Sequence, residues 1–349
     1  MLFHPVIIAL LLSSLTSTAM VGASVPFAVR LLRRWDLASG SEAQLLLERR
    51  TYLVSTLVQL VLLAQLASLV LFVFNADRMA SLFTGAMCAV GTLEADRFGF
   101  PALYANIALF FLAAAWLTLD HVDNRGWDYP LIRVKYAALL TLAPVLALAS
   151  LAELAYFLGL RADVITSCCS TLFSGGGITV AGNSLAALPH GLALVLLCLT
   201  LLAVFALGLR FLVGGRGGTA YGAASAAAFP VALAAVVSTL SVYVYELPNH
   251  HCPFCLLKAE YGHVGYALYI PLFAATACGI GAGIAQRCAD RASLAEAAQR
   301  TARCLAGWSL AGFAAFAIVA VCLVARSHLI LFGPSAWRPL AEFVVGGGR

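Results

Sequence analysis

Two cysteines separated by two residues are the part of this sequence best suited to chemistry. Residues 250–255 read His-His-Cys-Pro-Phe-Cys, and Lys258 follows three residues later. Such a pair can exchange disulfides, bind a soft metal ion, or simply close a loop. A disulfide between residues three apart would constrain very little of the chain. The motif therefore favours redox chemistry or metal binding, and a structural disulfide stays open as the third interpretation.

The proline in this motif predicts how the two thiols are presented. If Cys252 is the N-cap of a helix, Pro253 occupies the first helical position, where its missing N–H costs nothing. Cys252 would then lie at the positive end of the helix dipole, which favours the thiolate. Charged forms of His250 and His251 would favour it further. Cys255 would follow one turn later on the same face, close enough to form a disulfide.

Three other cysteines are candidates for the same chemistry. Cys168 and Cys169 are adjacent, so they could form an easily reduced vicinal disulfide, present two thiolates to a soft cation, or pack as two small residues. Cys88 stands alone in another polar stretch. The predicted catalytic residues are therefore Cys252, Cys255, Cys88, Cys168 and Cys169. The metal-binding alternative uses His250, His251, Cys252 and Cys255.

The elements that must position these residues are membrane-spanning helices. The chain is 62% hydrophobic and only 11% charged, with a mean hydropathy of +0.95, whereas soluble domains carry roughly a quarter charged residues. We predict an all-α, polytopic membrane helix bundle forming a single integral membrane domain over residues 1–349. Eight apolar segments approach the ~20 residues that cross ~30 Å of hydrocarbon: 5–29, 51–74, 101–119, 136–160, 190–213, 221–245, 264–285 and 305–325.

Basic residues are distributed unequally between the loops. The loops after the first, third, fifth and seventh segments hold 14 of them, against seven in the other loops and the C-terminal tail. Cytoplasmic loops carry the excess of Lys and Arg, so both termini are predicted to be extracytoplasmic. The candidate cysteines then face an oxidising compartment, where thiols can form disulfides. Nineteen of the 21 basic residues are Arg, which is typical of a GC-rich bacterial genome, and we predict a multi-pass protein of the bacterial cytoplasmic (inner) membrane.

Few polar residues interrupt the apolar segments. Glu153 lies in the outer half of the fourth segment, and an intramembrane carboxylate is a functional candidate by default. It could relay protons released by thiol oxidation, or it could be hydrated near the helix end. Gln59 and Gln65 in the second segment predict hydrogen bonds between helices. Residues 286–303 have apolar side chains near helical spacing and predict a short surface helix.

The stretch around Cys88 is similar to part of a known family. Cys88 is followed by Phe-Gly-Phe-Pro at residues 98–101, where the third segment begins. A loop cysteine followed by Phe-Gly-x-Pro resembles the outer loop of the vitamin K epoxide reductase family. A Cys-x-x-Cys near the outer end of another helix is that family's second signature, shared with the disulfide-bond formation protein B family. The resemblance implies that Cys252 and Cys255 exchange electrons with a quinone and that Cys88 is a shuttle cysteine.

The sequence also departs from those families. They have four or five helices where eight are predicted here, and the matching stretches cover a small part of the 349 residues. The loop has one cysteine where a shuttle pair is expected, unless Cys168 and Cys169 complete it.

The leading interpretation is a membrane thiol–disulfide oxidoreductase or electron relay. It would use a quinone as cofactor, with membrane lipid and an extracytoplasmic thioredoxin-like or other thiol protein as partners. The second is a transporter or insertion factor for copper, zinc or mercury, and the third is a non-catalytic membrane subunit with structural disulfides. Leu256 follows the motif where a haem-attachment site needs His, and no nucleotide-binding motif is present. The net charge of +5 is explained by membrane topology, so no nucleic-acid partner is predicted.

Overall fold

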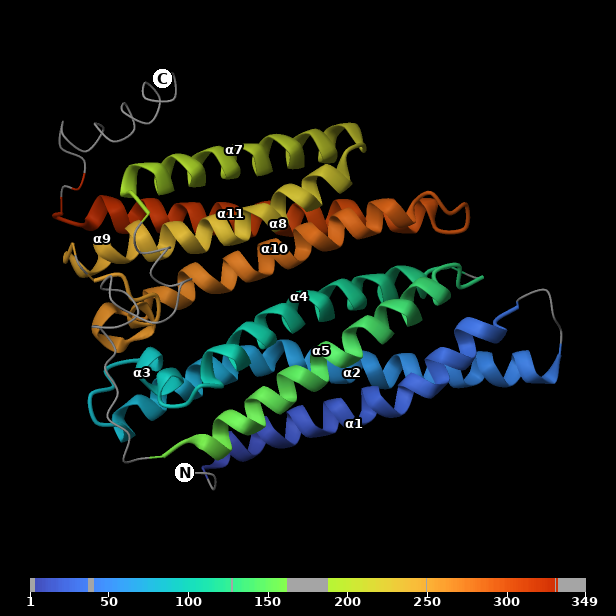
Figure 1. Cartoon of the computed structure of the whole chain (residues 1–349). Helices are drawn as coiled ribbons and strands as arrows, with labels where there is room; N and C mark the ends of the chain where they lie inside the picture. Colours follow the sequence, from blue (N-terminus) through green and yellow to red (C-terminus); the bar gives the residue numbers. More distant parts are fainter. Residues whose placement is uncertain are drawn as a thin grey trace, which may run out of the picture. The chain divides into compact units, whose positions relative to one another are not determined.

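The computed structural model describes residues 4–36, 41–126, 128–161, 188–248, 250–329 and 331, which are helical apart from their connections (Figure 1). These residues include eight helices long and apolar enough to cross a membrane: Pro5–Arg34, Glu42–Leu82, Gly99–Asp123, Ile132–Gly159, His190–Gly214, Gly218–Tyr245, Val264–Cys288 and Ala295–Arg326. The predicted all-α architecture with eight spans is confirmed, and the chain is a multi-pass membrane protein. The orientation of its termini stays a prediction.

Several helices extend beyond the apolar segments that predicted them. Helix α2 begins at Glu42, nine residues before the apolar segment, because the Ser41 side chain caps its first turn by accepting from the Gln44 amide. The predicted surface helix over residues 286–303 is wrong. Helix α10 ends at Cys288, and helix α11 runs from Ala295 to Arg326. Residues 295–303 are rich in alanine, the strongest helix former, so they extend the transmembrane helix instead of forming a separate one.

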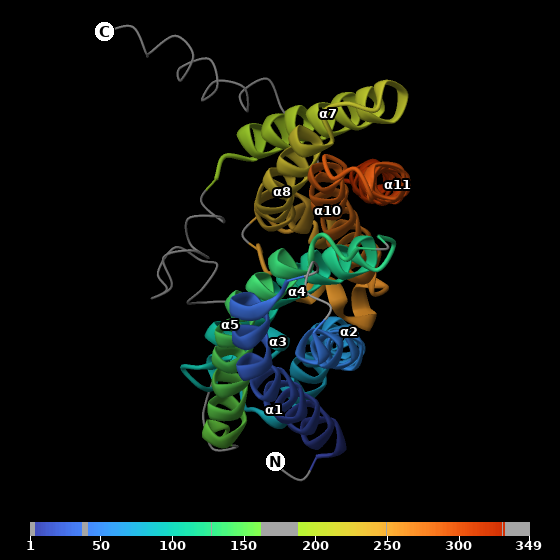
Figure 2. The same cartoon turned by 90° about the vertical axis from the view of Figure 1, so that its right-hand side faces the viewer.

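The chain divides into two compact units, the first of which contains a four-helix bundle. The bundle comprises α1 (Pro5–Arg34), α2 (Glu42–Met79), α4 (Gly99–Asp123) and α5 (Ile132–Gly159). The stretch Gly281–Cys304 also belongs to the first unit. Helix α1 packs against α2 and α5, and α4 packs against the same two helices (Figures 1 and 2). The four helices therefore form a closed ring around one core.

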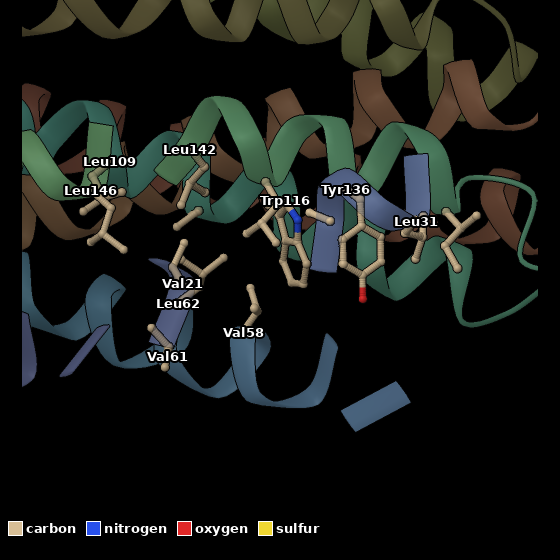
Figure 3. Packing of buried hydrophobic residues seen from close by; sticks show 14 of the residues in the cluster. Val21, Leu31, Val58, Val61, Leu62, Leu109, Trp116, Tyr136, Leu142 and Leu146 are labelled. Atoms are coloured by element: carbon tan, nitrogen blue, oxygen red, sulfur yellow. The ribbon is translucent and has the colours of Figure 1, made fainter. Parts of the chain in front are cut away.

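The middle of this bundle is apolar, with two large aromatic side chains near one end (Figure 3). The indole of Trp116 donates to the Lys135 carbonyl oxygen over 3.1 Å, and the Tyr136 hydroxyl donates to the Thr51 carbonyl oxygen over 3.2 Å. Leucines such as Leu15, Leu60 and Leu148 instead face outward. This arrangement suits a lipid environment, in which apolar side chains cover the outside and polar groups must be satisfied within the bundle.

A buried ion triad holds the end of the bundle where α4 leads into α5. The Lys135 ammonium lies 3.1 Å from Asp120 and 2.9 Å from Asp123, and all three side chains are buried. The Ser55 hydroxyl of α2 donates to Asp120, and the Leu131 amide donates to Asp123 over 2.9 Å. Paired and hydrogen-bonded in this way, the charges link α2, α4 and α5 without an exposed ion pair.

The second unit holds the other four spans. It comprises α7 (His190–Gly214), α8 (Gly218–Ala235), α9 (Ser241–Tyr245), α10 up to Ile280 and α11 from Leu305. Helices α7 and α8 pack together along their lengths. Their connection is short because Gly215 and Gly217 adopt positive φ angles of 67° and 91°.

Small and hydroxylated residues join the remaining helices of this unit. The Tyr221 hydroxyl of α8 donates to Ser309 of α11 over 2.7 Å, and Ser309 donates to the Ala275 carbonyl oxygen of α10 over 2.6 Å. A Cβ atom at Gly312 would lie 2.8 Å from the Ala275 Cβ atom. Close backbone approach with hydroxyl hydrogen bonds is the usual way in which transmembrane helices associate.

Candidate functional site: a buried dithiol loop

The Cys-Pro-Phe-Cys motif lies in the loop between α9 and α10. Cys252 is 2% exposed and Cys255 is 7% exposed. The loop starts at Glu246, whose φ of 54° ends α9, and it contains two short 3-10 turns, Cys255–Leu257 and Ala259–Tyr261. The motif is therefore enclosed by the protein and is not displayed at the tip of the loop.

The prediction that Cys252 caps a helix is wrong. Cys255 begins a single 3-10 turn, Lys258 is extended with φ −70° and ψ 150°, and α10 starts only at Val264. Gly262 and His263 take positive φ angles of 64° and 54° and redirect the backbone before the helix begins. A three-residue turn carries almost no macrodipole, so the thiols do not gain the stabilisation expected from a helix N-terminus.

Two tyrosines hold the motif by its backbone. The Tyr245 hydroxyl donates to the Cys252 carbonyl oxygen over 2.6 Å, and the Tyr269 hydroxyl donates to the Pro253 carbonyl oxygen over 2.9 Å. Gly265 at the start of α10 allows close packing, because a Cβ atom there would lie 2.8 Å from the Leu257 side chain. These two tyrosines thus fix the position of the dithiol.

A π-helix beside the loop binds two histidines. Residues Val236–Leu240, between α8 and α9, form one wide turn, a feature frequently found at functional sites. The Nδ1 atom of His190 lies 2.7 Å from the Ser238 carbonyl oxygen, and Nδ1 of His251 lies 3.3 Å from the Val237 carbonyl oxygen. These carbonyl oxygens assign the proton to Nδ1 of each ring. Each Nε2 is left able to accept a proton or bind a metal ion.

The two imidazole rings are stacked, with centroids 6.0 Å apart and an interplanar angle of 21°. The sequence analysis missed His190 because 61 residues separate it from His251. No local motif connects the two positions. Their pairing depends on the carbonyl groups of the π-helix.

The surroundings of the two histidines in the motif favour their neutral forms. Burial lowers the pKa of His250 and of His251 below the usual value, because the apolar surroundings disfavour the charged imidazolium. His250 also packs edge-on against the Tyr245 ring, with centroids 4.4 Å apart. The motif is therefore flanked by imidazoles that can accept protons or bind a metal ion.

Cys88 directly precedes α3 (Ala89–Glu94) in the first unit and is fully buried. The expected helix start at the Phe-Gly-Phe-Pro stretch is confirmed, since α4 begins at Gly99. Glycine is needed there because a Cβ atom would lie 2.1 Å from the Leu93 carbonyl oxygen. Cys168 and Cys169 lie outside the described residues, so their role stays a prediction.

Cys88 in the first unit and Cys252 and Cys255 in the second unit are all buried thiols. A role for His250 and His251 as metal ligands stays a prediction. Three thiols suit two kinds of chemistry. They can serve together as ligands for a soft metal, or two can form a disulfide while the third carries out exchange.

The helices and these thiols define a multi-span membrane protein with buried cysteines. No protein-family model, curated protein or solved structure matches the chain. The similarity to the vitamin K epoxide reductase and disulfide-bond formation protein B families therefore rests on the residues that carry it and stays a prediction.

Proposed function

We propose that this protein is a membrane thiol–disulfide oxidoreductase or electron relay, with Cys252 and Cys255 as its redox pair. The burial of both cysteines in a loop fixed by Tyr245 and Tyr269 carries this proposal. A redox dithiol has to bring two sulfur atoms together reproducibly, and a loop held by its backbone satisfies that requirement. The third buried thiol, Cys88, is the exchange partner.

The chemistry requires only thiol exchange and one electron acceptor. The Cys252 thiolate attacks a disulfide of a partner thiol protein, forming a mixed disulfide and releasing one partner thiolate, which takes up a proton. The Cys255 thiolate then attacks the Cys252 sulfur, releasing the second partner thiol and leaving a Cys252–Cys255 disulfide. The partner gains two electrons. In the opposite direction, the Cys252–Cys255 disulfide accepts two electrons from a partner dithiol, which becomes a disulfide, and the resulting Cys252/Cys255 dithiol would then give two electrons and two protons to a quinone.

Cys88 extends this sequence by one exchange. Its thiolate attacks the Cys252–Cys255 disulfide at Cys252, forming a Cys88–Cys252 disulfide and releasing the Cys255 thiolate. Each attack needs a deprotonated thiol, and the neutral imidazoles of His250 and His251 supply bases beside the motif. This role replaces the charge stabilisation that a helix N-terminus would have given.

A soft-metal site is the second candidate, and the burial of Cys252 and Cys255 beside the imidazoles of His250 and His251 favours it. Thiolates select copper, zinc and related ions, and an imidazole Nε2 can complete such a site. The His251 ring already has its Nδ1 next to a carbonyl oxygen, which is the arrangement that orients a metal-binding histidine. This site would require all the thiolates at once and would not cycle through a disulfide.

Acid-quenched thiol alkylation of the full-length protein in membranes, with metal analysis of the purified protein, distinguishes these candidates. For the redox proposal, Cys255→Ser should trap Cys252 in a stable mixed disulfide with Cys88 or a partner protein, because the resolving thiol is gone. Cys198→Ser is the control, since Cys198 lies exposed on α7. Stoichiometric copper or zinc that is lost in Cys252→Ser, with Cys252 never oxidised in cells, would refute the redox proposal and support the metal site.

A further inference from the structure

We propose that Glu153, in the core of the first unit, is a proton-binding site. Glu153 is fully buried within α5, and neither of its carboxylate oxygens has a hydrogen-bond partner among the described residues. Most buried polar groups in proteins are hydrogen-bonded, so an acid with two unpartnered oxygens needs an explanation. The proposal is independent of the function of the cysteines.

The polar neighbours of Glu153 are already engaged in other hydrogen bonds. Ser14 of α1 and Asn106 of α4 lie next to the carboxylate, but neither forms a hydrogen bond of good geometry with it. The Ser14 hydroxyl donates to Ser150 over 2.7 Å, and the Asn106 amide donates to the Ala102 carbonyl oxygen over 3.0 Å. The Ser14 hydrogen and one of the two Asn106 amide hydrogens are therefore used elsewhere, and neither side chain makes a well-formed hydrogen bond to the carboxylate.

The surrounding core adds further acceptors. Gln65 of α2 donates its side-chain amide to Asn106 over 3.4 Å, while its own oxygen, Oε1, is buried without a partner. Acceptor oxygens therefore outnumber donor hydrogens in this part of the core. A proton on Glu153 would reduce the difference, because a protonated carboxyl group donates one hydrogen bond. Asn106 separates Gln65 from Glu153, so the three side chains form one polar patch across α2, α4 and α5.

Among the described residues, the side chains that interact with Glu153 from α1 and α4 are Ser14 and Asn106, and neither of them titrates. Asp96 approaches the same helix further on, near Tyr156 and Gly159. On its own helix, Tyr156 lies nearly one turn further and uses its hydroxyl to donate to the Thr92 carbonyl oxygen. Lys135 and its two aspartates lie about five turns away along α5, roughly 27 Å. Because an unpaired carboxylate in an apolar environment is very costly, a proton is the ligand that neutralises Glu153.

A short chain of hydroxyl groups connects the site to a less buried part of the bundle. The Ser150 hydroxyl, nearly one turn before Glu153, lies 2.7 Å from those of both Ser14 and Thr18. Thr18 is half-buried, whereas Ser14 is buried. Since hydroxyl groups can both donate and accept, a rotation of the Ser14 hydroxyl toward the carboxylate would join this chain to Glu153 and complete a path for a proton.

An apolar carbodiimide tests the proposal, because it modifies protonated carboxyl groups inside membranes. The full-length protein in lipid nanodiscs would be treated with dicyclohexylcarbodiimide across a range of pH, and the modified peptide identified by mass spectrometry. We expect Glu153 to be modified, with the yield falling as the pH rises and the proton is lost. Glu153→Gln should abolish this modification, while the exposed Glu296→Gln should leave it unchanged.

Infrared spectroscopy of the wild-type protein gives a second measurement that does not depend on a variant folding. A protonated Glu153 should show the carbonyl stretch of a carboxylic acid, shifted in D₂O and altered by Asn106→Ala. A carboxylate spectrum with no carbodiimide modification at any pH would refute the proposal. Modification that sodium prevents at constant pH and ionic strength would also refute it, by showing that the site binds a metal cation.

Discussion

Removing the positive charge of Lys135 should destabilise the first unit strongly. The substitution Lys135→Met keeps an unbranched, flexible side chain but leaves Asp120 and Asp123 buried without their cation. Breaking a buried ion pair by removing one partner typically costs about 3–5 kcal/mol, because the remaining charge stays desolvated. Two aspartates share this lysine, at 3.1 and 2.9 Å, so we expect the upper part of that range.

The protein contains a natural control with the same geometry and the opposite exposure. Arg300 and Glu296 also approach to 3.0 Å, but their side chains are 76% and 88% exposed. Exposed pairs with this helical spacing contribute about 0.3–0.5 kcal/mol, so Arg300→Met should have little effect. Partial recovery is expected in Lys135→Met/Asp123→Asn, which removes one of the two unpaired charges and keeps an oxygen for the Leu131 amide.

The free energy of unfolding can be compared by reversible denaturant titration of the three variants in mixed micelles. The reasoning assumes that the triad is inaccessible to water. If Lys135→Met lost no more stability than Arg300→Met, water would have to reach the aspartates, and the triad would not anchor α4 to α5.

Two further predictions concern the dithiol loop and the start of α4. Burial lowers the pKa of His251 in the folded state, so the unfolded chain binds the proton more readily than the folded protein does. The contribution of His251 to stability is therefore complete above its ordinary pKa near 6.5 and is lost as the pH falls through the folded-state pKa. His251→Gln should therefore lose less thermal stability than wild type between about pH 7 and pH 5. A pH dependence that is the same in the variant and in the wild type would contradict this. Gly99→Ala places a Cβ atom 2.1 Å from the Leu93 carbonyl oxygen and should cost about 1–3 kcal/mol by overpacking. Gly307→Ala, where the Cβ atom would have no neighbour within 4 Å, should leave the denaturation midpoint unchanged or slightly raised, and equal losses in the two variants would refute the steric argument.

The helices could be predicted from the sequence because hydrocarbon imposes one simple requirement. Backbone groups inside a membrane must be satisfied within a helix or a closed barrel, so apolar segments of sufficient length identify helices without knowledge of their partners. Helix ends are less constrained. The N-cap at Ser41 and the alanine-rich start of α11 extend two helices beyond their apolar segments. Gln65 joins α2 to α4 as expected, whereas Gln59 is exposed, because the prediction could not tell which face each glutamine occupies.

The dithiol site was predictable in composition but not in geometry. Cysteine spacing identified the motif and proline position suggested a helix, yet the extended Lys258 and the positive φ angles at Gly262 and His263 separate the motif from α10. The tyrosine hydroxyls that hold the loop come from α9 and α10. Such contacts depend on how helices pack, and a pattern within the sequence does not contain that information.

Three buried acids of the first unit differ in whether their carboxylates have ion-pair and hydrogen-bond partners. This difference distinguishes structural acids from a functional candidate. Asp120 and Asp123 have a cation and hydrogen-bond donors, so their contacts account for them as structural groups that join α2, α4 and α5. Among the described residues Glu153 has no ion-pair partner, and neither of its carboxylate oxygens has a well-formed hydrogen bond. The structural role that explains the two aspartates therefore does not extend to Glu153, and this difference makes Glu153 the functional candidate of the three.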